Sequence, residues 1–150
     1  MWRHPALRPL SREHFTALSL VRDVRWAAAS GAIVLRDRAA LELAQAWRDQ
    51  LVAHFDAEER VLLPHMIAPE GEELLRQHAH LHALMAPLLA ALAQEQAPSS
   101  VDAEVAAEAL EAHVRWEEQT LFQGMQERLG EQPWANIGLA LGAEASSPTK

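Results

Sequence analysis

Potential metal ligands recur at a fixed spacing along this chain. Three pairs stand four residues apart, and one more histidine precedes them, which gives the set His14, His54/Glu58, His78/His82 and His113/Glu117. Residues four apart on an α-helix lie on the same face, so each pair would present two ligands side by side.

These residue types indicate a particular class of metal. Imidazole nitrogens combined with carboxylate oxygens suit Fe, Mn, Zn or Cu, and the set is too rich in nitrogen for Ca or Mg. A single ion ordinarily uses fewer ligands, whereas carboxylates can bridge two ions about 3.5–4 Å apart. A lone histidine on an apolar helix face is usually a satisfied core residue. Burying the whole set at one level without metal would leave several groups unpaired, each costing several kcal/mol. We therefore predict a dinuclear centre.

Long amphipathic segments would position these residues. Apolar periodicity, capping residues and breakers place helices at about residues 11–29, 37–67, 72–96 and 101–129, with a short fifth helix at about 133–141. Ser11 is a predicted N-cap, and Pro64 and Pro87 should each kink a helix. The predicted fold is all-α, an up-down-up-down four-helix bundle with a short C-terminal helix.

The register of such a bundle can be checked against the ligand positions. Counted from one shared end, the three pairs fall within about one helical turn of the same height. His14 fits less well, because it stands only three residues after Ser11. We expect one domain over residues 1–150, with a core at about 10–130 and disorder at 142–150.

Composition excludes several classes of function. The net charge of −8 argues against nucleic acid and anionic membrane surfaces as partners. The absence of cysteine excludes disulfides, thiolate metal sites and a cysteine nucleophile. No secretory signal and no apolar run of about 18 residues is present, so we expect no membrane partner and a cytoplasmic location. A homodimer is possible, but no feature specifies one.

The residues around these ligands form motifs of a known family. They are Ser11-Arg12-Glu13-His14, His54-Phe55-Asp56-Ala57-Glu58-Glu59 with Leu62-Leu63-Pro64, Gln77-His78 with His82, and His113-Val114-Arg115-Trp116-Glu117-Glu118 with Leu121-Phe122. Over about residues 10–130 the chain resembles the hemerythrin family, in particular its hemerythrin-like (HHE cation-binding) branch. The resemblance implies a non-heme di-iron site.

The resemblance also implies a role for each ligand. One iron would be held by His78, His82 and His113, and the other by His14 and His54. Glu58 and Glu117 would bridge the two irons together with an oxo or hydroxo group. Dioxygen would bind at the iron that has two histidines, where one coordination position is open.

One position departs from the oxygen-carrying members. They place an Asp five residues after the last histidine, where this chain has Glu118, with Glu117 beside it. Helical geometry favours Glu117, at about 40° from His113 against about 140° for Glu118. A Glu-bridged pattern is similar to iron-sensing and other hemerythrin-like domains.

Three functions follow for testing. The first is a di-iron protein that binds or senses dioxygen, a related small molecule or iron. The second is a di-iron enzyme handling peroxide or nitric oxide, although the chain has no Tyr or Cys as a redox partner. The third is a structural bundle whose site is empty or holds zinc. Ferritin-type ExxH pairs, HExxH and phosphate-binding loops are absent.

Neighbouring side chains are expected to play lesser parts. Phe15, Phe55 and Phe122 should form apolar walls around the metals, because such walls control solvent access. Glu13 and Glu59 are interpreted as solvated charges.

Overall fold

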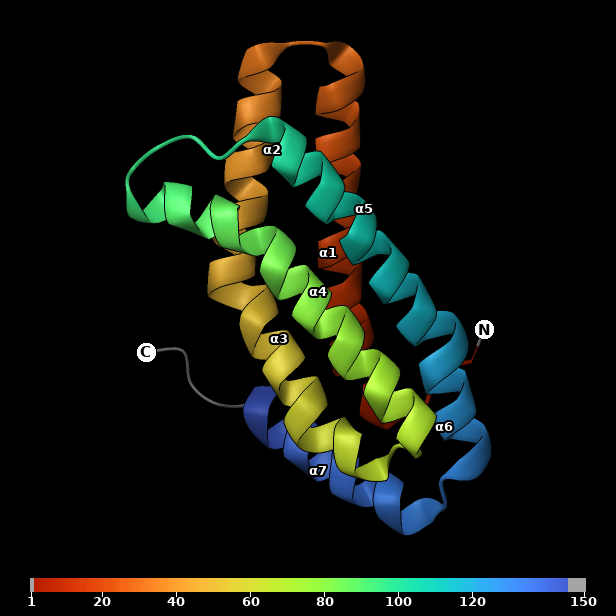
Figure 1. Ribbon diagram of the computed structural model, residues 1–150. Coiled ribbons are helices and arrows are strands. Elements are labelled where there is room, and N and C mark those ends of the chain that lie inside the picture. The colour runs from red at the N-terminus through yellow and green to blue at the C-terminus, as the bar shows by residue number, and fades with distance from the viewer. Residues whose placement is uncertain (1, 146–150) are drawn as a thin grey trace.

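The protein is all-helical over the part of the chain that the structure describes. The computed structural model describes residues 2–145, and side chains over 2–142. These residues form helices joined by short turns and contain no strand (Figure 1). None of the described helices is both long and apolar enough to cross a membrane.

The first helix begins earlier than its sequence signals suggested. A 3₁₀ turn, η1 (Pro5–Leu7), leads into α1 (Arg8–Ser30), which has a proline in its first turn. Ser11 therefore lies inside the helix rather than at its N-cap, and its hydroxyl donates to Glu118 instead. Gly31 ends α1 in the left-handed conformation, with φ of 68°, which glycine adopts without steric cost.

The second segment follows the predicted course but is not a uniform helix. It consists of α2 (Ile33–Ala46), a π turn η2 (Trp47–Leu51), α3 (Val52–Ala57), a second π turn η3 (Glu58–Leu62) and a 3₁₀ turn η4 (Leu63–His65). Pro64 lies within this last turn, where the helical segment ends.

The remaining helices complete the fold. They are α4 (Ala68–Ala93), α5 (Ser100–Trp116), a π turn η5 (Glu117–Leu121), α6 (Phe122–Arg128) and α7 (Glu131–Ala145). The side chain of Ser99 caps α5 by accepting from the N–H of Asp102. Pro87 lies inside α4. We expected disorder from Gly142, but α7 continues to Ala145; the rest of that prediction lies outside the described residues.

The apolar core consists of two clusters of buried side chains, one on each side of a layer of buried polar residues. Helix α1 packs on α2 and α5, and α4 packs on the same two helices, while α7 lies against η1 and η3 (Figure 1). One cluster includes Ala17 and Leu81, and the other includes Leu10 and Leu74. The buried histidines and glutamates lie between the clusters, as His14 does between Leu10 and Ala17 on α1. A buried polar level is thus enclosed by apolar packing on both sides.

Candidate metal centre

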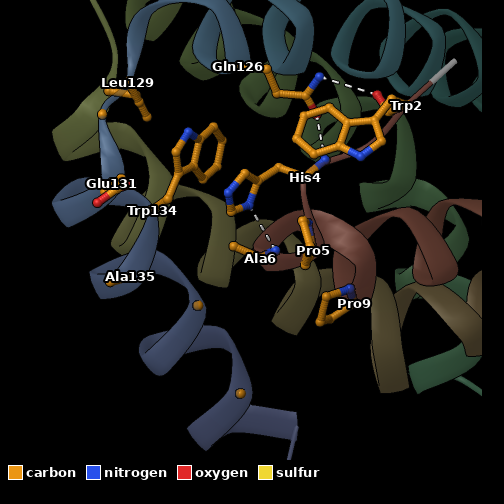
Figure 2. A pocket seen from close by; sticks show the side chains of 13 residues that line it. Trp2, His4, Pro5, Ala6, Pro9, Gln126, Leu129, Glu131, Trp134 and Ala135 are labelled. Atoms are coloured by element: carbon orange, nitrogen blue, oxygen red, sulfur yellow. Dashed lines mark hydrogen bonds between the residues drawn. The ribbon is translucent and has the colours of Figure 1, made fainter.

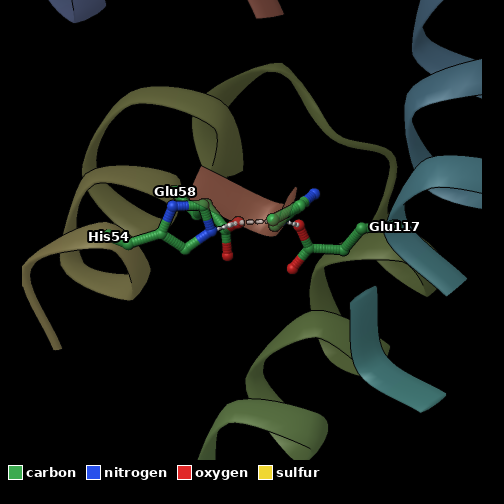
Figure 3. A group of neighbouring side chains, drawn as sticks. His54, Glu58 and Glu117 are labelled. Atoms are coloured by element: carbon green, nitrogen blue, oxygen red, sulfur yellow. Dashed lines mark ion pairs between the residues drawn. The ribbon is translucent and has the colours of Figure 1, made fainter. Parts of the chain in front are cut away.

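Six of the seven predicted ligands meet in the interior. The imidazoles of four histidines surround two carboxylates that have no exposed surface, the full set being His14, His54, Glu58, His78, His113 and Glu117. Figure 3 shows His54 and Glu58 on one side and Glu117 across from them. The ligand atoms form two groups, each within 4.8 Å, and Glu58 and Glu117 belong to both groups.

Glu58 divides its two oxygens between two histidine pairs. Its Oε1 lies 2.6 Å from Nε2 of His54 and 3.4 Å from Nε2 of His14. Its Oε2 lies 2.9 Å from Nε2 of His78 and 3.9 Å from Nε2 of His113. The carboxylate therefore faces both groups at once, as a bridging ligand must.

Glu117 repeats this division from the opposite helix. Its Oε2 lies 3.1 Å from Nε2 of His14. Its Oε1 contacts Nε2 of His113 and lies 3.8 Å from Nε2 of His78. Two carboxylates and two histidine pairs thus outline two adjacent positions for cations.

The unsatisfied atoms of the cluster fit metal ions at these positions. Among the described residues, no hydrogen-bond partner is found for Nε2 of His14, His54 and His113, for Oε1 of Glu58 or for either carboxylate oxygen of Glu117. Buried polar atoms without partners cost free energy, so natural proteins rarely keep several together without a ligand. Two ligands about 2.1 Å from one ion lie about 3 Å apart at right angles, which matches many of these nitrogen–oxygen separations.

The pKa values of the buried histidines depend on the neighbouring carboxylates. Burial lowers the pKa of His54, but the carboxylates of Glu58 and Glu13 outweigh burial and raise that pKa to about 9. At His78 burial again lowers the pKa, but the carboxylates of Glu117 and Glu58 outweigh burial and raise the pKa to about 9.

The two central carboxylates respond in the opposite direction. Burial raises the pKa of Glu117, but the imidazoles of His113, His14 and His78 outweigh it and hold the pKa well below its usual range. Without metal, protons on His54 and His78 therefore balance the carboxylates. Metal binding would displace those protons, because only neutral imidazole coordinates.

A second ring of polar groups faces the outer nitrogen of each imidazole. Nδ1 of His54 lies 3.3 Å from Glu13, Nδ1 of His78 lies 3.7 Å from Glu59, and Nδ1 of His14 lies 3.8 Å from Glu118. We expected Glu13 and Glu59 to be solvated charges, and both are partly exposed, yet both also face a ligand. Each stands next to a predicted ligand in the sequence, which is the signal that could have found them.

Gln77 fixes the tautomer of the fourth histidine. Its amide nitrogen donates to the Glu73 carboxylate at 2.8 Å, which turns the amide oxygen toward Nδ1 of His113 at 2.7 Å. Nδ1 must then carry the proton, and the lone pair of Nε2 points to the centre. This arrangement orients His113 for coordination.

Both central carboxylates stand where a helix changes geometry. Glu58 begins η3 and Glu117 begins η5, and their carbonyls accept from N–H groups five residues ahead, those of Leu63 and Phe122. Such π turns are rare in proteins, and those that occur often lie at functional sites. Regular α-helix up to Glu117 keeps His113 and Glu117 on one face. Glu118 is turned away from the centre and accepts from Ser11, in agreement with the choice of Glu117 as the central carboxylate.

His82 is the predicted ligand that the structure does not bring to the centre. Its side chain is exposed, and its ring packs edge-on against Trp47, with centroids 5.2 Å apart. The buried face of α4 passes through His78, Leu81 and Met85. His82 lies at the edge of this face, because a step of three residues follows His78 instead of four.

Aromatic rings cover the centre from two directions. Phe55 stacks on His78 with centroids 4.5 Å apart, and Phe122 stacks on His14 at 5.7 Å. Phe15 was expected to join them but is 78% exposed. Two of the three predicted walls are thus present, and they shield imidazoles from solvent.

Comparison with known proteins agrees with this geometry. A family model described as "Hemerythrin HHE cation binding domain" matches residues 6–125. No curated protein and no solved structure matches the chain. The match spans all six clustered residues together with His82, and its description names the binding of cations.

Proposed function

Because the chain belongs to the hemerythrin family, we propose that it is a non-heme di-iron protein that binds or senses dioxygen or a related small molecule. One iron would be held by His14 and His54, and the other by His78 and His113. Glu58 and Glu117 would bridge them. The division of each carboxylate between two histidine pairs is the observation that carries this proposal.

The proposed fold matches this role. The contacts of α1 and α4 with α2 and α5 support a single domain built as an up-down-up-down four-helix bundle. In such a bundle the ligands come from facing helices and project inward.

Apolar side chains surround the outer side of His54. A hollow of about 190 Å³ lies there, lined by Glu13 together with apolar side chains such as Leu10 and Ala57. An iron pair, when bound, supplies reversible electron transfer toward a diatomic molecule. The protein would hold the ions, orient the imidazoles through their Nδ1 partners and exclude water with Phe55 and Phe122. Binding or sensing is favoured over catalysis, since the sequence has no Tyr or Cys as a redox partner.

Anaerobic loading with Fe²⁺ followed by controlled exposure to air tests the proposal. We expect two irons per chain and an absorption change on aeration that reverses under vacuum. Stoichiometry below two irons would refute the dinuclear site. Two irons with permanent oxidation would refute reversible dioxygen binding.

A pair of histidine variants makes the ligand assignment testable. His54→Ala should reduce bound iron, because it removes a buried imidazole 2.6 Å from Glu58. His80→Ala is the matched control, since His80 is an exposed histidine on α4. Retention of two irons by His54→Ala would contradict the assignment.

A further inference from the structure

The N-terminal arm, residues 2–4, carries an arginine that reaches toward the metal centre. Arg3 donates from Nη2 to the carbonyl oxygen of Glu118 at 2.7 Å, and its Nε lies 3.5 Å from the Glu118 carboxylate. Its guanidinium also lies over the ring of Phe122, 5.3 Å from the centroid. The Arg3 side chain is only 14% exposed, so this contact is partly desolvated.

Both partners of Arg3 contact the same proposed ligand. The Glu118 carboxylate lies 3.8 Å from Nδ1 of His14, and the Phe122 ring stacks on the His14 ring with an interplanar angle of 13°. Ser11 donates to the same carboxylate at 2.7 Å. The His14 imidazole therefore has one partner of Arg3, the Glu118 carboxylate, at its outer edge and the other, the Phe122 ring, against its face.

The arm has further anchors, and one of them is shared with Arg3, whose Nη1 donates to the side-chain oxygen of Gln126 at 3.2 Å. The side-chain oxygen of Gln126 accepts from the backbone N–H of His4 at 2.8 Å, and the Gln126 amide nitrogen donates to the carbonyl of Trp2 at 3.3 Å. The His4 ring stacks on Trp134 of α7, with centroids 4.2 Å apart (Figure 2). Neither Arg3 nor Trp134 lies within residues 6–125, which the family model matches.

We propose that Arg3 is a positioning residue for the metal ion at His14. It fixes the Glu118 carboxylate and the Phe122 ring, and these hold the imidazole with Nε2 toward Glu58 and Glu117. The inference rests on the proposed function, because it requires His14 to be a ligand. Outer partners of ligating histidines typically change metal affinity 10–100-fold when they are removed. The effect should be confined to one ion, since Glu118 and Phe122 both contact His14, whereas Gln126, another partner of Arg3, holds the N-terminal arm.

Two-step titration with Co²⁺ tests this role, because its absorption spectrum reports the coordination of each ion. Arg3→Gln should weaken one of two Co²⁺ sites about tenfold and alter the spectrum of that site. Arg22→Gln is the matched control, since Arg22 lies 5.1 Å over the Trp26 ring and contacts Ser19 and Asp23 on the same helix. Gln126→Ala, which removes the acceptor shared by Arg3 and the His4 N–H and so releases the arm, should weaken the same site.

A double variant separates positioning from general stabilisation. If Arg3 acts partly through the Glu118 carboxylate, Arg3→Gln combined with Glu118→Gln should weaken binding of the ion by less than the sum of the two single losses. An additive loss, an equal loss at both sites, or unchanged affinity in Arg3→Gln would overturn the proposal. Those results would leave the two-ion site intact, whereas fewer than two Co²⁺ ions in the unmodified protein would overturn both proposals.

Discussion

Replacing Glu58 with glutamine should destabilise the metal-free protein in a way that depends on pH. The side chain is fully buried, and the attraction of its carboxylate is the largest effect opposing burial at His54. Glutamine keeps the shape but removes the charge. Burial would then dominate at His54, whose pKa should fall from about 9 toward or below its ordinary value.

The expected loss of unfolding free energy follows from the pKa of His54. A rise from about 6.5 to about 9 at 1.36 kcal/mol per pH unit gives roughly 3 kcal/mol. This figure is the net effect at His54 alone, in which Glu13 adds to the rise while burial and His14 oppose it. A raised histidine pKa stabilises the fold fully below the unfolded pKa, about 6.5, and that stabilisation is lost as the pH rises through about 9. The difference between Glu58→Gln and the unmodified protein should therefore be largest near pH 6 and shrink by pH 9.5.

Urea unfolding of Glu58→Gln and of the unmodified protein, in the presence of a chelator, measures the difference in unfolding free energy at pH 6 and at pH 9.5. Glu42→Gln is the control, because Glu42 pairs with Arg38 on the surface, where exposed ion pairs contribute about 1 kcal/mol or less. Equal destabilisation by Glu58→Gln at the two pH values, or none at pH 6, would refute the electrostatic reasoning.

Three further predictions follow from the same structure. The unmodified metal-free protein should lose unfolding free energy between about pH 6.5 and 9, as His54 and His78 deprotonate, while its Zn²⁺ affinity should rise, because neutral imidazole is the ligand. Urea unfolding and Zn²⁺ titration at several pH values measure the two quantities, and a change of both in the same direction would contradict the linkage. His78→Ala should lose one of two bound ions, whereas His82→Ala should keep both, as elemental analysis would measure; loss of an ion in His82→Ala would restore the seven-ligand set that the sequence predicts. Gly31→Ala should lower the unfolding free energy by about 1 kcal/mol, because Gly31 has a φ of 68°. Gly130→Ala is the control, since Gly130 also has open space around it. Equal melting temperatures for the two variants would contradict the prediction.

The sequence contained most of the information about the ligands. Spacing of four residues on an α-helix is a local property, so the pairs His54/Glu58 and His113/Glu117 could be placed on common faces before any packing was known. The preference for Glu117 over Glu118 followed from the same geometry. The helices were also found, although α1 and α7 extend beyond their predicted ends, because helix ends depend on contacts with neighbouring elements.

Other features depend on how the helices meet. His82 has the right spacing from His78, yet packing turns the buried face of α4 toward Leu81 and leaves His82 at its edge. The partners of Nδ1 come from other helices in every case, so no local pattern could assign Glu13 to His54 or Gln77 to His113. The π turns at Glu58 and Glu117 were not anticipated either.

The sequence by itself determined which residues could bind metal and that His54/Glu58 and His113/Glu117 each share a helix face, because a regular backbone fixes that geometry. Only the tertiary structure decided that Glu58 and Glu117 each face two histidine pairs, and that Arg3 lies behind His14. Those relations join segments far apart in the chain. They depend on the packing of one helix against another, which local periodicity does not specify.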